Sequence, residues 1–401
     1  MRIESIKAKE ILTSKGSLTV EVCLETAKGQ FVASVPSGVS TGDYEAVEIP
    51  ASEAIKKTVE IEPMLKKRDF FSQKDFDCFL LKQDGTKNKS RLGANTTLSF
   101  SIAFCRALAA QEDLPLWKYI HKICNLQSFW LRQISSCSAG SSAARHSETI
   151  FKMPRPCVLL FEGGKHGNGG LTFQEILLVP QAGSFQEMFD KAKIVFETLK
   201  SQLNYPFGLE GGLVAPLKEE EILDLITQRT SEQIGIDVAA SSFFVQGKYD
   251  FQGKKIFAEN FLAFYQVLRK NYNILFFEDP FSQDDINGWK KAKEIFSVGD
   301  DLLATNVKRM KKAKKFCWGA IIKPNQIGTV WETLQAVRLA KKFGWKIIVS
   351  HRAGETEDSF IADLAVGVGA DFIKAGGLSQ QERLAKYNRL LEIEKALEKM
   401  I

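Results

Sequence analysis

Six residues with chemically useful side chains each follow a short apolar segment in the C-terminal part of the chain: Asp237, Glu278, Asp300, Lys323, His351 and Lys374. Carboxylate oxygens with no nearby cysteines favour a hard cation such as Mg²⁺ over Zn²⁺ or copper. A lysine whose pKa is lowered by desolvation and by a second cation can act as a base. The combination predicts a metal-assisted proton abstraction, with Lys323 as the base and Lys374 as the neighbouring cation.

The spacing of these residues indicates the elements that hold them. From Glu278 to Lys374 the steps are about 22 to 28 residues long, which is the length that a β-strand and its return helix need. Repeated units of this kind predict a parallel sheet closed into a barrel, whose active site lies at the C-terminal ends of the strands. The six side chains are therefore expected to converge on one mouth.

Each of these residues also has a simpler interpretation. A lone carboxylate after an apolar run is often a helix N-cap, and a lysine at such a position can simply neutralise a neighbouring carboxylate. A metal site is therefore indicated by the occurrence of three carboxylates, Asp237, Glu278 and Asp300, in successive units, and not by any one of them alone.

Three loops carry further candidates. His351 and Arg352 follow the apolar run Ile347–Ser350, and an arginine at a strand end suits a phosphate or carboxylate clamp. The glycine-rich stretch 163–170 contains His166 and could close over a small ligand. Glu210 lies in the loop 208–212. Glycine-rich loops are weak signals because most of them are plain turns.

The rest of the chain predicts two domains joined by a linker. Alternation over 18–35 with a turn at Gly29 predicts strands, residues 1–12 read as another strand, and helices are expected over 52–66, 73–82 and 94–112. We therefore expect an α+β domain over 1–122. Residues 123–153 are rich in small and polar side chains, which indicates a linker or insert. Residues 154–401 are expected to form the catalytic (β/α)8 barrel, an α/β fold.

Composition limits the partners. The chain has 401 residues and a net charge of +6, and its densest basic stretch is 308–315. This stretch could be a nucleic-acid patch, but the exposed end of a barrel helix is the favoured interpretation, so no nucleic acid is expected. The seven cysteines form no close pair, which fits free thiols in the cytoplasm. Neither a signal peptide nor a membrane span is predicted.

Several longer strings then become recognisable: Pro36–Gly42, Asn88–Asn95, Ile234–Ser241, Phe277–Phe281, Gly299–Leu302, Lys323–Gly328, Ser350–Asp358 and Glu382–Asn388. On these strings the chain resembles the enolase (phosphopyruvate hydratase) family over residues 1–121 and 154–398. The resemblance implies a capping domain on an eight-fold barrel, usually in a homodimer. It also implies reversible dehydration of 2-phosphoglycerate to phosphoenolpyruvate with two Mg²⁺ ions per active site.

The resemblance also assigns roles by position. Asp237, Glu278 and Asp300 match the ligands of the first metal, and Ser40 matches a ligand of the second. Lys323 matches the base that removes the proton α to the carboxylate, and Glu210 matches the acid that assists departure of the hydroxyl. The remaining matches are to substrate-contacting positions: His166, Glu175, His351, Arg352 and Lys374.

The chain departs from the family pattern at positions that bear on activity. Lys15 replaces an arginine, Ala353 replaces the serine that helps to hold the phosphate, and Leu209 replaces the aspartate before the acid. Leu213 looks inserted, and Ser242 replaces a glutamate. Two alternatives stay open: a different acid-sugar dehydration, or a catalytically impaired relative with a binding role. Retention of the acid, base and metal matches favours an active glycolytic enzyme.

Overall fold

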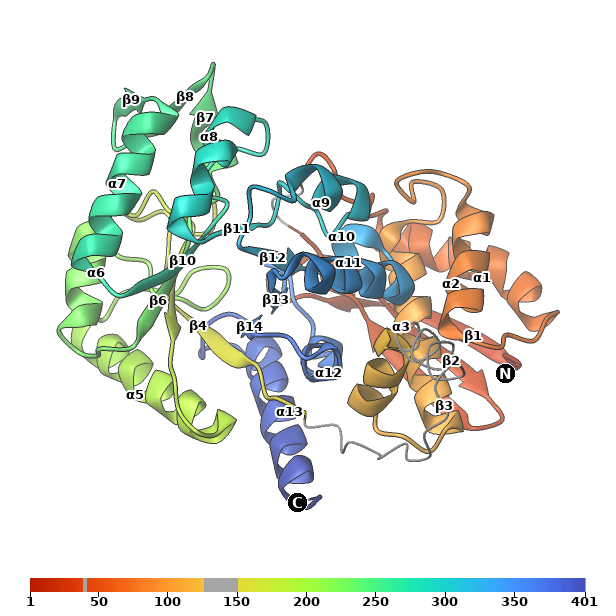
Figure 1. Cartoon of the computed structure of the whole chain (residues 1–401). Coiled ribbons are helices and arrows are strands. Elements are labelled where there is room, and N and C mark those ends of the chain that lie inside the picture. The colour runs from red at the N-terminus through yellow and green to blue at the C-terminus, as the bar shows by residue number, and fades with distance from the viewer. Residues whose placement is uncertain (39–41, 126–150, 401) are drawn as a thin grey trace, which may run out of the picture.

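The computed structural model describes residues 1–38, 42–125 and 151–400. The N-terminal part is a three-stranded antiparallel sheet covered by helices, as the sequence predicted (Figure 1). The strands are β1 (Ser5–Leu12), β2 (Leu18–Thr26) and β3 (Gly29–Ser34), and the helices are α1 (Ala51–Lys66), α2 (Gln73–Asp84) and α3 (Ala94–Gln111). Helix α3 packs on β2 and β3 with one face and contacts the barrel segment 324–327 with another, so nearly all of its residues are buried.

Eight strands form the closed barrel that the spacing predicted. They run in the order β4 (Arg155–Glu162), β5 (Glu175–Val179), β6 (Gln233–Asp237), β10 (Ile274–Glu278), β11 (Ser297–Gly299), β12 (Gly319–Ile322), β13 (Lys346–Ser350) and β14 (Phe372–Lys374). The expectation of an all-parallel sheet was wrong for β5, which pairs antiparallel with both β4 and β6. The connection 163–174 contains no helix, and without a crossover helix the chain returns as an antiparallel strand.

Helices surround the barrel on its outer side (Figure 1). They are α5 (Phe185–Leu203), α6 (Glu219–Thr227), α7 (Ala258–Asn271), α8 (Ile286–Lys291), α9 (Val307–Ala313), α10 (Pro324–Ile327), α11 (Val330–Phe343), α12 (Phe360–Val368) and α13 (Gln381–Glu398). Local sequence sets several ends: the side chains of Ser184 and Thr329 cap the N-termini of α5 and α11, and Gly344 ends α11 in the left-handed conformation. A small sheet of β7 (Phe244–Val245), β8 (Lys248–Phe251) and β9 (Lys254–Ile256) stands beside α7.

The inside of the barrel is filled by apolar side chains. One buried cluster takes alternate residues from the strands, including Leu159, Leu177, Phe276, Ile321 and Ile348. Their sequence neighbours point outward and pack under the helices in a second, larger cluster. Because the interior is packed, a ligand can be held only at an end of the barrel.

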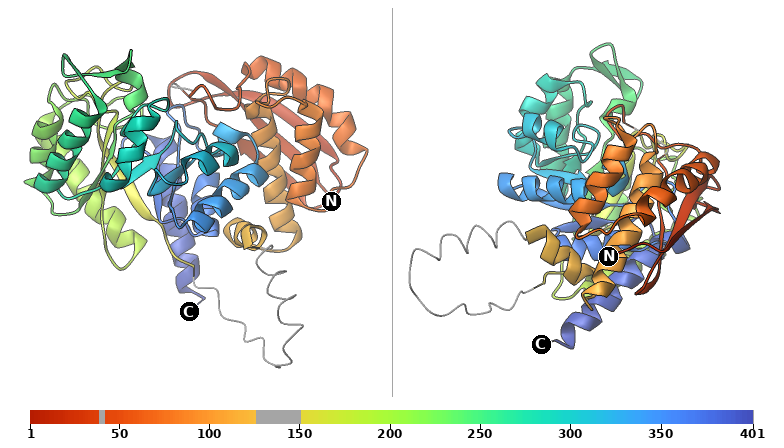
Figure 2. Two further views of the ribbon diagram at one scale, coloured as in Figure 1. Left: turned by 45° about the horizontal axis from the view of Figure 1, so that its top comes forward. Right: turned by 90° about the vertical axis from the view of Figure 1, so that its right-hand side faces the viewer.

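The N-terminal domain docks on the barrel through buried polar contacts, and Figure 2 shows it on one side of the barrel. The backbone N–H of Trp331 in α11 donates to Asp77 of α2 over 2.8 Å. Arg106 of α3 makes two hydrogen bonds to Asp358 at 2.8 and 2.7 Å. These contacts hold helices α2 and α3 of the N-terminal domain against α11 and the loop after β13.

Two further expectations concern thiols and membranes. The described cysteines are free; Cys105, Cys124, Cys157 and Cys317 are buried, and Cys78 is exposed. Cys137 lies outside the described residues. Among the helices that the structure describes, we find none that combines the length and the apolar character needed to cross a bilayer. The basic stretch 308–315 begins within helix α9, and most of its lysines are exposed.

Candidate active site

Four carboxylates lie in one register row at the C-terminal end of the barrel. Glu162 pairs with Glu175, Glu175 with Asp237, and Asp237 with Glu278, across β4, β5, β6 and β10. Glu175 is the first residue of its strand, but β5 runs antiparallel, so it reaches the same end as the last residues of its neighbours. All four side chains are buried. The reversal of β5 therefore adds a carboxylate that an all-parallel barrel would have placed at the far end.

Lys374 reaches into this row from β14. Its ammonium lies 2.8 Å from Asp237, 2.9 Å from Glu278 and 3.1 Å from Glu175. Burial works to lower the pKa of Lys374, but the three carboxylates outweigh it and the pKa is raised well above its usual value. Burial and the Asp237 carboxylate together raise the pKa of Glu278 well above its usual value. One ammonium group thus forms ion pairs with three carboxylates.

Asp300 and Lys323 follow β11 and β12 and form an ion pair that is largely shielded from solvent. Asp279 accepts the backbone N–H groups of Asp300 at 2.9 Å and Asp301 at 2.7 Å, which fixes the turn that carries Asp300. Gln326 donates to the other Asp300 oxygen at 2.9 Å. The ion pair thus joins the ends of two neighbouring strands, β11 and β12.

The expected lowering of the Lys323 pKa was wrong for the chain without a bound metal. Burial and the neighbouring cations Arg352 and Lys374 do act to lower this pKa, as expected. The Asp300 carboxylate outweighs them, so the pKa of Lys323 is raised above its usual value. An amine can act as a base only once it has lost its proton. The Asp300 carboxylate stabilises the protonated form of Lys323, so any ligand that engages Asp300 will change how readily Lys323 loses its proton.

Most of the predicted residues line one cavity of about 230 Å³ between the barrel end and the loop after β3. The lining includes His166, Glu175, Glu210, Asp237, Asp300, Lys323, His351, Arg352 and Lys374. Glu278 lies behind Lys374 and is fully buried. Ser40 lies outside the described residues, although Gly42 and Asp43 beside it line the cavity. Tertiary structure therefore brings together side chains from both domains.

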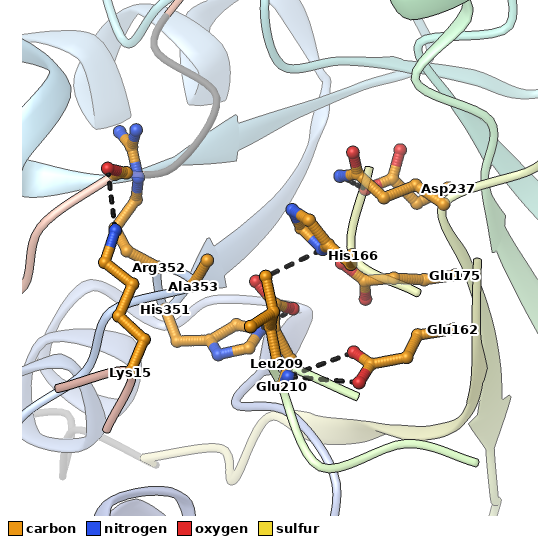
Figure 3. Close-up of polar contacts among 12 residues, drawn as sticks. Lys15, Glu162, His166, Glu175, Leu209, Glu210, Asp237, His351, Arg352 and Ala353 are labelled. Atoms are coloured by element: carbon orange, nitrogen blue, oxygen red, sulfur yellow. Dashed lines mark hydrogen bonds and ion pairs between the residues drawn. The ribbon is translucent and has the colours of Figure 1, made fainter. Parts of the chain in front are cut away.

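Glu210 sits between two histidines (Figure 3). Its carboxylate oxygens lie 3.6 Å from Nδ1 of His166 and 3.3 Å from Nε2 of His351. Burial lowers the pKa of His166 to about 4. Burial and the adjacent Arg383 guanidinium lower the pKa of His351 well below its usual value. Arg383 donates to Nδ1 of His351, so the neutral imidazole carries its proton on Nε2, which faces Glu210.

Arg352 is held by groups from the N-terminal domain and from α10. It donates to Glu45 at 2.6 Å and to Asn325 at 3.3 Å. Ala353 beside it is buried and presents no hydroxyl to the cavity. Lys15 donates to the Gly38 carbonyl at 3.0 Å, and burial lowers its pKa, with Glu48 opposing and Arg352 adding to this effect. The cations Lys15 and Arg352 therefore stand close together at this edge of the pocket (Figure 3).

The remaining departures sit around Glu210 and beyond β6. Leu209 is half-buried next to Glu210, whereas Leu213 is fully buried. Leu213 exchanges backbone hydrogen bonds with β4, donating to Leu160 at 2.8 Å and accepting from Glu162 at 3.0 Å. Leu213 thus anchors the loop 208–213, which carries Glu210, to the barrel. Ser242 lies in the short helix Ala240–Phe243 and lines the cavity.

Three residues around the site were not found from the sequence: Glu162, Arg383 and Glu45. Glu162 ends the apolar run of β4, so the rule that found Asp237 and Glu278 applies to it as well. Arg383 and Glu45 lie in polar helical and loop segments with no comparable pattern. Only the fold shows that these two contact His351 and Arg352.

The donor set fits a hard cation. Asp237 and Glu278 pair with Lys374, Asp300 pairs with Lys323, and one buried Glu278 oxygen has no hydrogen-bond partner in the described structure. The carboxylate and histidine atoms that lie within 4.8 Å of one another belong to two neighbouring sets: Glu175, Glu210 and His351, and Glu162, His166 and Glu210. Buried carboxylates that outnumber their cations favour binding of a metal ion.

The comparisons with known proteins agree with this geometry. Residues 3–120 match the model of the enolase N-terminal domain, and residues 150–401 match that of the enolase C-terminal TIM barrel domain. Enolase B of Dictyostelium discoideum is 39% identical over 447 aligned positions, covering 100% of this chain and 96% of that protein. The chain belongs to the enolase family of hydro-lyases, the phosphopyruvate hydratases.

Proposed function

We propose that the pocket dehydrates 2-phosphoglycerate reversibly to phosphoenolpyruvate, the enolase step of glycolysis and gluconeogenesis. The observation that carries the proposal is that a partly buried lysine, Lys323, and a buried carboxyl group, Glu210, line one small cavity. One can accept the proton from the carbon α to the carboxylate, and the other can donate a proton to the departing hydroxyl.

Lys323 is the proposed base. Its Nζ must be free of its proton before reaction, and in the chain alone the Asp300 carboxylate holds that proton. Lys323 becomes competent when the Asp300 oxygens are engaged elsewhere, because the nearby cations Arg352 and Lys374 then favour its neutral form. Ligation of a metal by Asp300 would have this effect.

Glu210 is the proposed acid. Its carboxyl lies between His166 and His351, both held neutral by burial. The pocket around the leaving hydroxyl is therefore lined by neutral imidazoles, which can donate or accept hydrogen bonds without adding charge. Glu175 and Lys374 lie next to this group and are proposed to contact the substrate.

Two Mg²⁺ ions are the proposed cofactors. Asp237, Glu278 and Asp300 would hold the first; Ser40, outside the described residues, is proposed as a ligand of the second. When bound, such cations neutralise the substrate carboxylate and so stabilise the charge that develops as the α proton leaves. The pairing of a lysine or histidine base with Mg²⁺ is the established chemistry of enolase-superfamily sites.

Arg352 is the proposed phosphate clamp. A guanidinium binds phosphate through paired N–H groups, and Glu45 and Asn325 fix its position. Ala353 adds no hydroxyl here. Lys15 stands at the same edge and can supply positive charge.

The test is the absorbance rise of phosphoenolpyruvate formed from 2-phosphoglycerate by the purified chain, with and without Mg²⁺. A rise that depends on the metal supports the proposal. Absence of any rise, with the protein folded and Mg²⁺ bound, would favour a different acid-sugar substrate or a binding role.

We also propose a homodimer in the cytoplasm. Leu12 and Leu18 are cross-strand partners at the turn end of the β1–β2 hairpin and are 67% and 54% exposed. Exposed apolar pairs of this kind favour contact with another chain. The free described thiols suit a reducing compartment. Sedimentation of the wild type and of Leu12→Glu tests the dimer.

A further inference from the structure

Arg383 of helix α13 is a fully buried arginine that touches the loops of the pocket from behind. Within the described residues, its guanidinium donates hydrogen bonds only to uncharged acceptors. They are Nδ1 of His351, the backbone carbonyls of Leu209, Arg352 and Ala353, the Ser14 hydroxyl and the side-chain carbonyl of Gln380. Burial of a cation without a bonded carboxylate is costly, so these contacts call for an explanation.

The carbonyl contacts join the loops in which the chain departs from the family pattern. Leu209 and Ala353 are two of these departures, and Arg383 donates to their carbonyls at 3.4 and 2.7 Å. The same nitrogen lies 3.4 Å from the hydroxyl of Ser14, the neighbour of Lys15. A hydrogen bond to a backbone carbonyl does not depend on the side chain that the residue carries. Arg383 can therefore hold these loops in place although their side chains differ from the pattern.

The contact with His351 fixes where the imidazole carries its proton. A guanidinium can donate but cannot accept, so Nδ1 is the acceptor and the proton lies on Nε2. Nε2 lies 3.3 Å from Oε2 of Glu210 (Figure 3). That oxygen is buried and has no hydrogen-bond partner among the described residues. Such contacts are often long before substrate binds and shorten in the reacting complex, so the N–H fixed by Arg383 faces an unfilled acceptor of the proposed acid.

The chain leaves room for this arrangement at Gly376, just after β14. A Cβ there would stand 2.8 Å from Cδ of Arg383 and 3.1 Å from Cε1 of His351. Gly376 has a φ of +87°, which glycine adopts without strain, and the Tyr387 hydroxyl donates to its carbonyl at 2.8 Å. The guanidinium and the imidazole are thus packed against each other and against a fixed turn.

We propose that Arg383 is a positioning residue for Glu210 that acts through His351. It fixes the His351 tautomer whose Nε2–H is aimed at one Glu210 oxygen, so the other oxygen carries the proton. When that O–H bond breaks, the proton joins the departing hydroxyl to form water, and the negative charge stays on the Glu210 carboxylate. The His351 N–H stabilises this charge. The inference rests on the proposed role of Glu210 as the acid.

The first test locates the proton on His351 by NMR. The full chain with Mg²⁺ is labelled with ¹⁵N in its four histidines, and the His351 signal is the one that His351→Gln lacks. We expect a protonated Nε2 and an unprotonated Nδ1. The opposite tautomer, or an imidazolium at neutral pH, would overturn the proposal. This test uses the wild type and does not require any Arg383 variant to fold.

Two Arg383 variants then show whether Arg383 fixes the tautomer. In Arg383→Met the single tautomer should be lost, because no group then donates to Nδ1. Arg383→Lys should keep it, because an ammonium can also only donate. If Arg383→Met retains the wild-type His351 signal, Arg383 does not set the proton position and the proposal is wrong.

The second test is a double-mutant cycle on kcat for 2-phosphoglycerate with Mg²⁺. Arg383→Met should lower kcat about tenfold, as replacement of other outer-shell partners does, and Arg383→Lys should recover part of the loss. In a His351→Gln background, the amide can donate to Glu210 without any tautomer to fix. Arg383→Met should therefore change kcat there by less than about twofold. An equal loss in both backgrounds would show that Arg383 has only a structural role.

Arg389→Met is the matched control. Arg389 lies on the same helix, but it pairs with Asp363 and Glu392, neither of which lines the cavity. Its replacement should leave both the His351 signal and kcat unchanged.

Glu210→Gln separates this inference from the proposed function. If that variant keeps the full kcat, Glu210 is not the acid and the inference fails with it. If Glu210→Gln loses kcat while Arg383→Met leaves the His351 tautomer unchanged, the acid stands and only the role of Arg383 is wrong.

Discussion

Two halves of the pocket hold their side chains in different ways. The strand-end half, Asp237, Glu278, Asp300, Lys323 and Lys374, stands at or directly after the barrel strands β6, β10, β11, β12 and β14. The loop half, His166, Glu210, Arg352 and Ala353, stands on connections. Strand ends are constrained by the closed hydrogen-bonding of the barrel, whereas a loop can change locally without disturbing it.

Most of the expected departures from the family pattern fall on the loop half. Leu209 and Ala353 lie on its loops and Lys15 lies at its edge, whereas Ser242 lies just beyond β6. The carboxylates and lysines of the strand-end half are the residues to which the resemblance assigned metal binding, proton abstraction and substrate contact. The groups proposed for proton abstraction are therefore held by the barrel strands, whereas the groups proposed to surround the leaving hydroxyl and the phosphate are held by loops.

The largest expected effect is in the strand-end half. Lys323→Ala should lower kcat by about 10²–10⁴-fold, because a general base contributes this much. Single-turnover formation of phosphoenolpyruvate measures it, and thermal melting checks the fold. Full activity of this variant would show that Lys323 is not the base. It would also contradict the assignment of proton abstraction to the strand-end half.

Metal binding should also depend on the strand-end half. At a Mg²⁺ concentration of 100 times Kd, binding to the folded chain stabilises it by about 2.7 kcal/mol, and EDTA should abolish this gain. Asp300→Asn should shrink the Mg²⁺-dependent rise in Tm. Asp371→Asn, at the opposite end of the barrel where Asp371 pairs with Lys346, should leave it unchanged. Equal rises in both variants would contradict the assignment.

In the loop half, the buried His166 should make the free energy of unfolding depend on pH below neutrality. The pKa of His166 is lowered to about 4 in the folded chain by burial, so the unfolded chain binds its proton first as the pH falls below about 6.5. The metal-free wild type therefore loses stability on acidification, by about 2 kcal/mol at pH 5 from this group. His166→Asn should lack that loss in urea unfolding at pH 5 and 7.5. An identical loss in the variant would show that His166 is not held neutral.

The smallest expected effect concerns the phosphate edge. Ala353→Ser restores a hydroxyl beside Arg352, and one hydrogen bond to a charged group contributes about 1.5 kcal/mol, or roughly tenfold in affinity. The KM for 2-phosphoglycerate and the inhibition constant for inorganic phosphate should both fall. If neither changes, Lys15 already supplies the missing interaction, and Lys15→Met should then raise both constants.

The sequence by itself determined the barrel, the N-terminal sheet and the catalytic candidates. Helix α3 (Ala94–Gln111) ends one residue short of the predicted range 94–112, and the strand-end residues were found because each closes an apolar run. Hydrophobic periodicity and the residues that begin and end helices and strands are local properties of the chain, so a single sequence is enough to identify them. The domain boundaries near residues 122 and 153 stay predictions, because residues 126–150 are not described.

Only the tertiary structure decided three other features. The reversal of β5 depends on the short connection 163–174 and places Glu175 in the carboxylate row. The protonation of Lys323 depends on a neighbour 23 positions away, Asp300. The contacts of Arg383 with His351 and of Glu45 with Arg352 span 32 and 307 positions. The charge state of a buried group depends on what the fold packs against it, and no local pattern in the sequence carries that information.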